Sequence, residues 1–221
     1  MFKLSESSSY LVFGASGAIG SACAQKLKLD GKVVDGCRNL LELQNQISQI
    51  SGFDGVVWAQ GFNVADNTDT FDINVYENVI EANLTFIINS LKTLKSTGKL
   101  KDDSQLVVLS SIWGHLSRPN KLSYAISKAA VGGLVRSLAV DLGPIGIQIN
   151  AVSPGPIDTP MTARNLNPEE LERVISETPI RRLVTLEEVS SVVCGLATGR
   201  FRGLTGQDLI IDGGWSDSKL V

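Results

Sequence analysis

A glycine-rich turn between an apolar run and a helical segment constrains this chain more than any other feature. Residues 10–13 (Tyr-Leu-Val-Phe) are typical of a short buried strand, and residues 14–20 (Gly-Ala-Ser-Gly-Ala-Ile-Gly) lead into a helical pattern over 18–29. Glycines here allow a tight turn and a close approach of the backbone to a diphosphate, and the following helix N-terminus attracts negative charge. The context therefore predicts a turn that binds the diphosphate of a dinucleotide.

Strands and helices alternate along the whole chain. The apolar runs are rich in Val, Ile and Leu without strict alternation, as expected for a parallel sheet covered on both faces. This order predicts a single doubly wound α/β domain of the Rossmann type over 1–221, with a parallel sheet of about six strands and helices on both faces. The expected strands are 10–13, 32–36, 54–58, 105–110, 146–152 and 207–211. The expected helices are 18–29, 40–50, 72–97, 123–142, 168–176 and 186–198.

A tyrosine and a lysine form a candidate acid/base pair. Tyr124 and Lys128 lie four positions apart in the expected helix 123–142, so both side chains share one face of it. A phenol normally keeps its proton to about pH 10, and a nearby ammonium favours the phenolate. The pair follows Ser111 closely and is suited to proton exchange with an alcohol or carbonyl. Taken alone, the same spacing also fits two ordinary surface residues.

Several motifs, in order and suitably spaced, make the chain resemble a classical short-chain dehydrogenase/reductase from about residue 10 to residue 215. The glycine-rich turn is similar to the family's TGxxxGxG, and Tyr124 with Lys128 matches its YxxxK. Ser111 ends a strand as the family's catalytic serine does, and Asn83 occupies the position of its helix asparagine. Residues 154–159 (Pro-Gly-Pro-Ile-Asp-Thr) and 206–214 resemble its PGxIxT segment and its closing strand and turn.

The resemblance implies an oxidoreductase that transfers a hydride between a nicotinamide cofactor and a ketone or secondary alcohol, similar to the 3-oxoacyl carrier-protein reductases. Tyr124 would exchange the proton, and Ser111 would hydrogen-bond the substrate oxygen. Lys128 would lower the pKa of Tyr124 and hold the nicotinamide ribose. Asn83 would anchor a water between Lys128 and solvent, with a helix kink or cap as the alternative reading. Ser110 is expected to be structural.

The resemblance also implies which residues contact the cofactor. Ile157 and Thr159 would hold the nicotinamide carboxamide. The full expected set is Gly14, Ser16, Ile19, Arg38, Ala59, Gly61, Tyr124, Lys128, Ile157 and Thr159. No metal site is expected.

The end of the second strand favours NADP. An acidic residue there would bind the ribose 2′-hydroxyl of NAD, whereas an Arg accepts the 2′-phosphate of NADP. In the resemblance, Cys37 occupies the acidic position and Arg38 the basic position that follows. Asp35 lies two residues too early, so NADP is expected, with NAD as the alternative. The other reading of Arg38 is a solvated charge at a strand end.

The chain departs from the family pattern at three short sites. Phe13 replaces the threonine before the first glycine, Ala18 replaces the middle glycine, and 58–61 (Trp-Ala-Gln-Gly) replaces NNAG. Loss of NNAG is expected to affect local packing more than chemistry. Ala18 adds a methyl where the backbone approaches phosphate, which is expected to weaken cofactor binding.

The segment after the second strand is too short for the family's usual content. The family places a helix, a third strand and another helix there, but a βαβ unit needs about 30 residues. The interval 39–57 has room for one helix, 40–50, before the strand that ends at Trp58. We therefore expect the third strand, which lies at the sheet edge, to be missing or vestigial.

Composition excludes several other classes of function. The net charge of −3 provides no basic footprint for nucleic acid, and no apolar run approaches the roughly 20 residues that span a membrane. The N-terminus lacks the apolar region of a signal peptide, and Cys23, Cys37 and Cys194 follow no disulfide or metal-binding spacing. A cytoplasmic protein with reduced thiols is expected.

The substrate side is less constrained by the sequence. His115 and Trp113 follow Ser111 and either line the substrate cleft or are plain loop residues, and about 160–180 is the expected substrate lid. Arg164, Arg181 and Arg182 could attract an acidic substrate, although solvated charges are the preferred reading.

Two long helices predict assembly. Helices 72–97 and 123–142 carry more apolar residues than one sheet face should cover, which predicts a homo-oligomer, a tetramer or a dimer. The apolar residues concerned are Val79, Ile80, Phe86, Ile87, Val131, Leu134, Val135 and Leu138.

Two other functions remain open from the sequence. One is a polyol, sugar or cyclic-alcohol dehydrogenase that uses NAD. The other is a dinucleotide-binding sensor or scaffold without turnover, which the shortened segment after Arg38 favours. The complete set of catalytic positions favours the enzyme with a small carbonyl or alcohol substrate.

Overall fold

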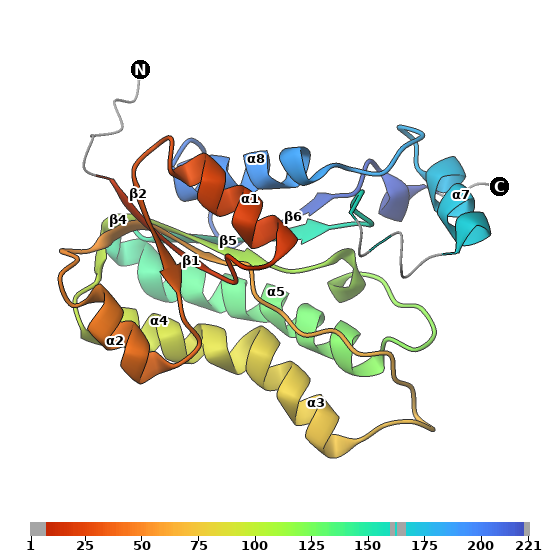
Figure 1. The fold of residues 1–221 in the computed structure, drawn as a ribbon, viewed down its shortest axis with the longest axis horizontal. Helices are drawn as coiled ribbons and strands as arrows, with labels where there is room; N and C mark the ends of the chain where they lie inside the picture. The colour runs from red at the N-terminus through yellow and green to blue at the C-terminus, as the bar shows by residue number, and fades with distance from the viewer. Residues whose placement is uncertain (1–7, 160–161, 163–166, 219–221) are drawn as a thin grey trace.

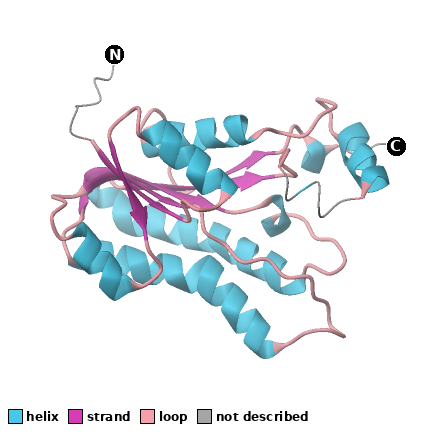
Figure 2. Cartoon of the chain, in the orientation of Figure 1, coloured by secondary structure: helices cyan, strands magenta, loops and turns pink. Residues whose placement is uncertain are grey.

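Six parallel strands form one sheet in the computed structural model, which describes residues 8–159, 162 and 167–218 (Figures 1 and 2). The strand order is β2-β1-β3-β4-β5-β6, and every neighbouring pair is parallel. The order reverses next to β1, as in a Rossmann-type sheet. The strands are β1 (Ser9–Phe13), β2 (Lys32–Gly36), β3 (Phe53–Trp58), β4 (Leu100–Leu109), β5 (Gln148–Pro154) and β6 (Asp208–Ile211).

Helices cover both faces of this sheet (Figure 1). Helices α1 (Ala18–Leu27) and α8 (Leu186–Ala197) pack on one face, and α2 (Leu40–Ile47), α4 (Phe86–Ser96) and α5 (Leu122–Leu142) pack on the other. Alternate residues of β1 therefore enter different cores: Leu11 and Phe13 join α2, α4 and α5, whereas Tyr10 and Val12 join α1 and α8. The fold class expected from the alternating pattern is confirmed.

The expected elements are all present, with one interruption. The expected helix 72–97 consists of α3 (Ile73–Ile80) and α4, joined by a π-helical turn, Glu81–Thr85. Helix α7 (Pro168–Glu177) and α8 begin at capping boxes, with Asn167 and Thr185 as the N-cap residues. None of the helices in the described ranges is long and apolar enough to cross a bilayer.

Among the residues that the structure describes, no strand lies beyond β2, as the length of the 39–57 interval predicted. Helix α2 connects β2 directly to β3, so β2 forms the edge of the sheet within the described residues. Asn39 caps α2 by accepting hydrogen bonds from two backbone amides of its first turn. The Gln46 side chain reaches back from α2 and donates to the Asp35 carbonyl at 2.7 Å. The helix is thereby held against the edge strand.

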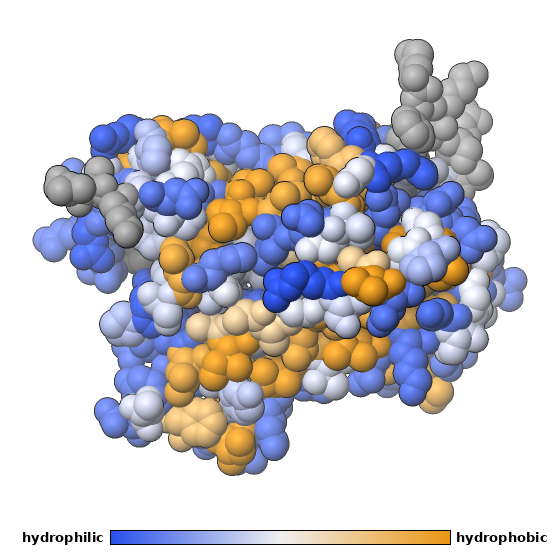
Figure 3. Space-filling view, turned by 180° about the vertical axis from the view of Figure 1, so that it is seen from behind, coloured by the Kyte–Doolittle hydropathy of each residue, from blue (hydrophilic) through white to orange (hydrophobic). Residues whose placement is uncertain are grey.

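Most of the apolar residues that suggested an oligomer are buried within the chain itself. Val79, Phe86, Ile87, Val131 and Val135 are all buried, and Leu134 and Leu138 pack partly against the same core. Figure 3 shows apolar residues in the middle of one face of the molecule, surrounded by hydrophilic ones. A homo-oligomer stays a prediction, and these side chains no longer require it.

Two of the departures from the family pattern lie side by side in the core. Phe13 and Trp58 are register partners on β1 and β3, and their rings stack with centroids 5.8 Å apart. The Phe86 ring meets the Phe13 ring edge-on at 5.2 Å. The Trp58 indole nitrogen donates to the Ser90 hydroxyl at 2.8 Å in a fully buried position. Packed aromatic rings and one buried hydrogen bond therefore stabilise the sheet at these two positions.

The Trp58–Ser90 hydrogen bond gives a test of this packing. We expect Ser90→Ala to lower the free energy of unfolding by about 1–3 kcal/mol, because the indole N–H would lose its buried acceptor. In a Trp58→Phe background the same substitution should cost less than half as much, since no indole donor remains. Urea unfolding followed by circular dichroism measures both values, and equal costs in the two backgrounds would contradict the assignment.

Candidate active site

The candidate site lies where β4 ends. Ser110 and Ser111 follow Leu109, the last residue of the strand, and the carboxyl ends of parallel strands share this edge of the sheet. Ser110 is fixed by its backbone, which donates to Val152 O at 2.7 Å, and its side chain donates to Lys128 O at 3.3 Å. Its expected structural role therefore fits these bonds. Ser111 is the N-cap residue of the short 3-10 turn Ile112–Gly114, and its hydroxyl accepts from the Trp113 amide.

Tyr124 and Lys128 meet Ser111 from helix α5. The Ser111 side chain lies close enough to the Tyr124 hydroxyl to affect its pKa, and the Lys128 Nζ lies 5.7 Å from the centre of the Tyr124 ring. Burial raises the pKa of Tyr124 above its ordinary value, and Ser111 opposes only part of the rise. The net lowering expected for this pKa does not occur, because desolvation of the phenolate dominates.

Lys128 is one of the most deeply buried charged residues in the described part of the chain, with 4% of its surface exposed. Its Nζ donates to the Leu109 carbonyl at 2.8 Å, at the end of β4. Burial lowers the pKa of Lys128 to about 8, and the negative charge of Asp208 partly opposes that shift. Gly61 lies against the same ammonium, since a Cβ there would be 3.7 Å from Nζ and 3.2 Å from Asn83 Oδ1.

Asn83 lies in the π-helical turn between α3 and α4. Its Oδ1 accepts from the Phe62 amide at 2.7 Å, and its Nδ2 donates to Phe62 O and to Ser127 Oγ, both at 2.9 Å. The side chain thus links the loop after β3 to the middle of α5, next to Lys128. The widened turn explains the placement, since π-bulges redirect a side chain without ending the helix.

The glycine-rich turn fits a dinucleotide diphosphate. Gly14 has φ +77°, and a Cβ on it would lie 2.6 Å from the Gln60 backbone nitrogen. A Cβ on Gly20 would lie 2.1 Å from the Gly14 carbonyl, so both positions require glycine. Gly17 is the N-cap of α1 and provides no side-chain cap, which leaves the first-turn amides available to an anion. Ala18 is exposed in this first turn.

Gln60 is a candidate binding residue that the sequence interpretation missed. It is 7% exposed, and both its Nε2 and its Oε1 are buried without a hydrogen-bond partner among the described residues. Its backbone touches the position of Gly14, so this amide lies beside the glycine-rich turn. A buried amide without partners is costly unless a ligand satisfies it. The sequence did contain a signal for this residue, because Gln60 stands where the family's NNAG motif has a small alanine.

The other expected cofactor residues are spread along the same edge. Ser16 is exposed on the turn, while Ile19 and Ala59 pack partly against the α1–α8 core. Ile157 is nearly buried and forms an isolated bridge to Val184. Thr159 Oγ1 lies 3.2 Å from the Thr162 hydroxyl, and Arg38 is exposed two residues past the end of β2.

His115 has a partner that the sequence did not suggest. Its Nε2 lies 2.9 Å from Asp208 Oδ2, and Ser153 Oγ donates to the other oxygen of Asp208 at 2.6 Å. The histidine therefore ties the loop after Ser111 to β6. It is therefore more than a plain loop residue, and its place in the substrate cleft stays a prediction.

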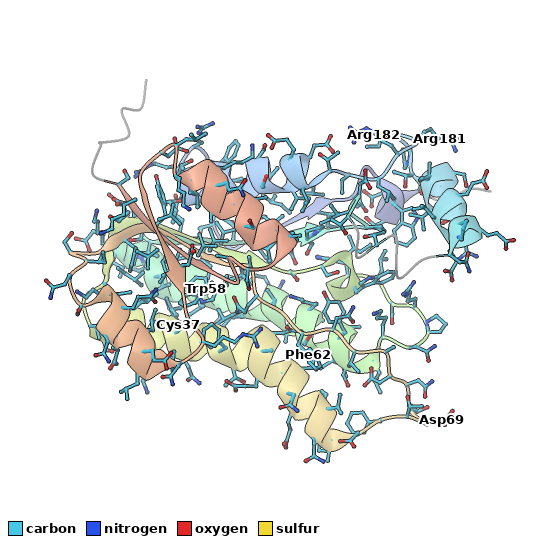
Figure 4. All side chains as sticks on the ribbon, in the orientation of Figure 1. Cys37, Trp58, Phe62, Asp69, Arg181 and Arg182 are labelled. Carbon is cyan, nitrogen blue, oxygen red and sulfur yellow. The ribbon has the colours of Figure 1, made fainter. Side chains whose placement is uncertain are left out.

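The arginines and tryptophan near the expected lid make contacts of their own. Arg182 pairs with Glu188 through two bonds of 2.6 and 2.9 Å, and Arg181 donates to Ser176 O. Figure 4 shows Arg181 and Arg182 beside α7, on the opposite side of the molecule from Cys37. Trp113 meets Trp215 edge-on at 5.9 Å. Arg164 and most of 160–166 lie outside the described residues.

Known proteins resemble this chain over most of its length. A family profile described as enoyl-(acyl carrier protein) reductase matches residues 19–216. The 3-oxoacyl-[acyl-carrier-protein] reductase FabG of Rickettsia typhi is 32% identical over 235 residues, which cover 92% of this chain and 95% of that protein. The oxidoreductase UcpA of Escherichia coli O157:H7 is 37% identical over 143 residues, 61% of this chain and only 54% of that protein.

Solved structures agree with the fold. The ligand-free aldohexose dehydrogenase of Thermoplasma acidophilum superimposes with a TM-score of 0.88 at 24% identity, covering 98% of this chain and 96% of that one. The gluconate 5-dehydrogenase of Burkholderia cenocepacia, in complex with NADP and tartrate, has a TM-score of 0.86 at 19% identity, covering 96% of each chain. With the fold established in this way, the profile and the FabG relative show that the chain belongs to the classical short-chain dehydrogenase/reductase family of NAD(P)-dependent oxidoreductases.

Proposed function

We propose that this chain reduces a ketone to a secondary alcohol with a nicotinamide cofactor, with Tyr124 as the general acid. The observation that carries the proposal is that Tyr124 lies beside both Ser111 and the buried Lys128 ammonium at the end of β4. Two hydroxyls that meet in this way can both donate to one carbonyl oxygen. The FabG relative matches this chain over 95% of its own length and is named as a 3-oxoacyl-[acyl-carrier-protein] reductase. Its name supports the same reaction class.

The raised pKa of Tyr124 suits the proton-donor role that reduction requires. A raised pKa keeps the phenol protonated at neutral pH, and a protonated phenol can give its proton to the carbonyl oxygen. Oxidation of an alcohol would instead require the phenolate as a base. When bound, the nicotinamide cofactor supplies the hydride that the carbonyl carbon receives. Ser111 stabilises the oxygen by a second hydrogen bond while its negative charge develops.

Lys128, Asn83 and the glycine-rich turn support this chemistry. Lys128 is held by the Leu109 carbonyl beside the Tyr124 ring, where its remaining N–H groups can hold a ribose hydroxyl. Asn83 fixes the loop that carries Gly61 against Lys128. The first turn of α1 would bind the cofactor diphosphate, and the buried Gln60 amide would hydrogen-bond the cofactor beside it.

NADP is the cofactor that we propose, on the strength of Arg38. The residue is exposed just past β2, with Cys37 in place of an acidic neighbour. A guanidinium can offer a phosphate two parallel hydrogen bonds.

A non-catalytic dinucleotide sensor is the second candidate. The observation that favours it is the sheet edge at β2, because the family's third strand normally carries part of the adenine pocket. The two candidates make different predictions: a reductase requires the Tyr124 hydroxyl for turnover, whereas a sensor has no turnover to lose.

Tyr124→Phe should lower the turnover of any carbonyl substrate by about 10²–10⁴-fold, since the proton donor is removed. The fold and the affinity for cofactor should stay close to wild type. Steady-state rates, with circular dichroism and cofactor titration as controls, measure this. Tyr76→Phe on α3 is the matched control and should keep full activity. A Tyr124→Phe protein with more than a tenth of the wild-type rate would rule out the proposed acid.

Lys128→Met should stabilise the folded protein at pH 7 while abolishing turnover. The folded-state pKa of about 8 lies below the ordinary value of 10.5, so the buried ammonium lowers stability below pH 8. Between pH 8 and about 10.5 the unfolded chain binds the extra proton, so wild-type stability rises with pH and the gain from Met shrinks. The gain at pH 7 is up to about 3 kcal/mol. Urea unfolding at pH 7 and 9.5 measures it. A loss of stability at both pH values would mean that the bonds of Lys128 outweigh its desolvation.

Arg38→Asp should reverse the preference between NADPH and NADH. We expect wild-type protein to bind NADPH at least tenfold more tightly, because Arg38 would pair with the 2′-phosphate, which an aspartate in its place would repel. Titrations followed by tryptophan fluorescence give both dissociation constants. Lys32→Asp, at the opposite end of the same strand, is the matched control and should not alter the ratio. Equal affinities of wild type for the two cofactors would remove Arg38 from the binding site.

A further inference from the structure

A second lysine lies beside the ring of Tyr124. Lys121 is the N-cap residue of α5, and only 8% of its surface is exposed. Its Nζ is 5.5 Å from the centre of the Tyr124 ring, which is as close as the Nζ of Lys128 at 5.7 Å. The role proposed for Lys128 does not require this second ammonium. Its position next to the proton donor needs a separate explanation.

Lys121 has no carboxylate partner among the ion pairs of the described residues. Its Nζ donates to the neutral Asn63 Oδ1 at 2.8 Å, which uses one of three N–H groups. The nearby buried carboxylate of Asp66 is already occupied. It accepts from the Ser123 amide at 3.0 Å and from the Ser123 hydroxyl, and so serves the start of α5. Among the described residues the ammonium therefore has no ion-pair partner within contact distance, although the charge of Asp66 favours it from further away, and such burial is costly in the absence of a ligand.

A second cation lies on the same loop. The Arg118 guanidinium lies 5.2 Å from the centre of the Trp113 ring. Burial lowers the pKa of Lys121, and the positive charge of Arg118 lowers it further, while Asp66 acts in the opposite direction. Residues 115–121 (His-Leu-Ser-Arg-Pro-Asn-Lys) contain no acidic residue. An anion placed beside Lys121 would relieve both the desolvation and the repulsion between the two cations.

The loop that carries Lys121 is fixed by hydrogen bonds. Asn120 adopts φ +59°, and its Oδ1 accepts from Asn67 Nδ2 at 2.7 Å. The Leu122 amide donates to the Asp66 carbonyl at 3.2 Å, so the loop after β3 holds the start of α5 on both sides of Lys121. The ammonium is thus positioned before any ligand arrives, which reduces the entropy lost on binding.

We propose that Lys121 is a subsite for a carboxylate of the carbonyl substrate, so that the substrates of this chain are short oxo acids. The inference rests on the proposed function, because the carbonyl is placed by Tyr124 as its proton donor. The Lys121 ammonium lies 5.5 Å from the centre of the ring that carries the proton-donating hydroxyl. We therefore expect the carboxylate to lie near the carbonyl in the substrate, as in 2-oxo and 3-oxo acids. Arg118 adds positive charge behind the subsite without touching the reacting atoms.

Acetoacetate and its methyl ester form a matched pair of probes that differ in the charge. With saturating NADPH, and in parallel with NADH, wild type should show at least a tenfold higher kcat/KM for the acid. Lys121→Gln keeps a donor for Asn63 and removes the charge. It should raise KM for acetoacetate at least tenfold with kcat within threefold, and leave the ester within twofold. Lys92→Gln, an exposed lysine on α4, controls for the loss of one charge and should change neither substrate.

Binding separates this proposal from the proposed function. Calorimetry with 3-hydroxybutyrate, a product-like acid, should show binding to wild type that weakens at least tenfold in Lys121→Gln. Turnover of acid and ester with equal kcat/KM in wild type would overturn the subsite and leave the reductase standing. Lys121-dependent binding without turnover of any carbonyl would support the subsite and overturn the reductase. Absence of acid binding together with absence of an acid preference would overturn the subsite.

Discussion

The hydrogen bond from the buried Lys128 ammonium to the Leu109 carbonyl is the contact around which the candidate site is organised. It joins the middle of α5 to the end of β4, and so sets the distance between Tyr124 and Ser111. A Cβ on Gly61 would crowd Asn83 Oδ1 at 3.2 Å, and Asn83 holds the loop that carries Gly61 from the π-helical turn. The buried ammonium thus lies where three separate segments meet. Such sites commonly sacrifice stability for geometry.

The sheet shows how polar bracing can be exchanged for packing. The ring of Phe13 stacks on that of Trp58, and the indole closes the arrangement by donating to Ser90 on α4. Phe13 and Trp58 each depart from the family pattern when they are considered one at a time. Taken together they fill one volume and satisfy its single polar donor. The site at the end of the neighbouring strand keeps its shape because the sheet beneath it remains fully packed.

Sequence patterns predicted the fold almost completely and the site only in part. The apolar runs and the length of the 39–57 interval are local signals, so they predicted elements and the absent strand. The contact of His115 with Asp208 joins residues 93 positions apart, and no local pattern reports it. The direction of the Tyr124 pKa depends on burial, which spacing along a helix does not reveal. The unpaired Lys121 ammonium became visible only when its neighbours were placed.

The edge strand β2 has a consequence for the behaviour of the chain in concentrated solution. A strand at the border of a sheet offers backbone groups to any other extended chain and so invites strand addition and aggregation. Here the strand has only five residues, and the charged side chains of Lys32 and Asp35 are exposed on it. The amide of Gln46 also occupies the Asp35 carbonyl from α2. The shortened segment that leaves β2 at the border of the described sheet thus also supplies the side chain that occupies one carbonyl of that border.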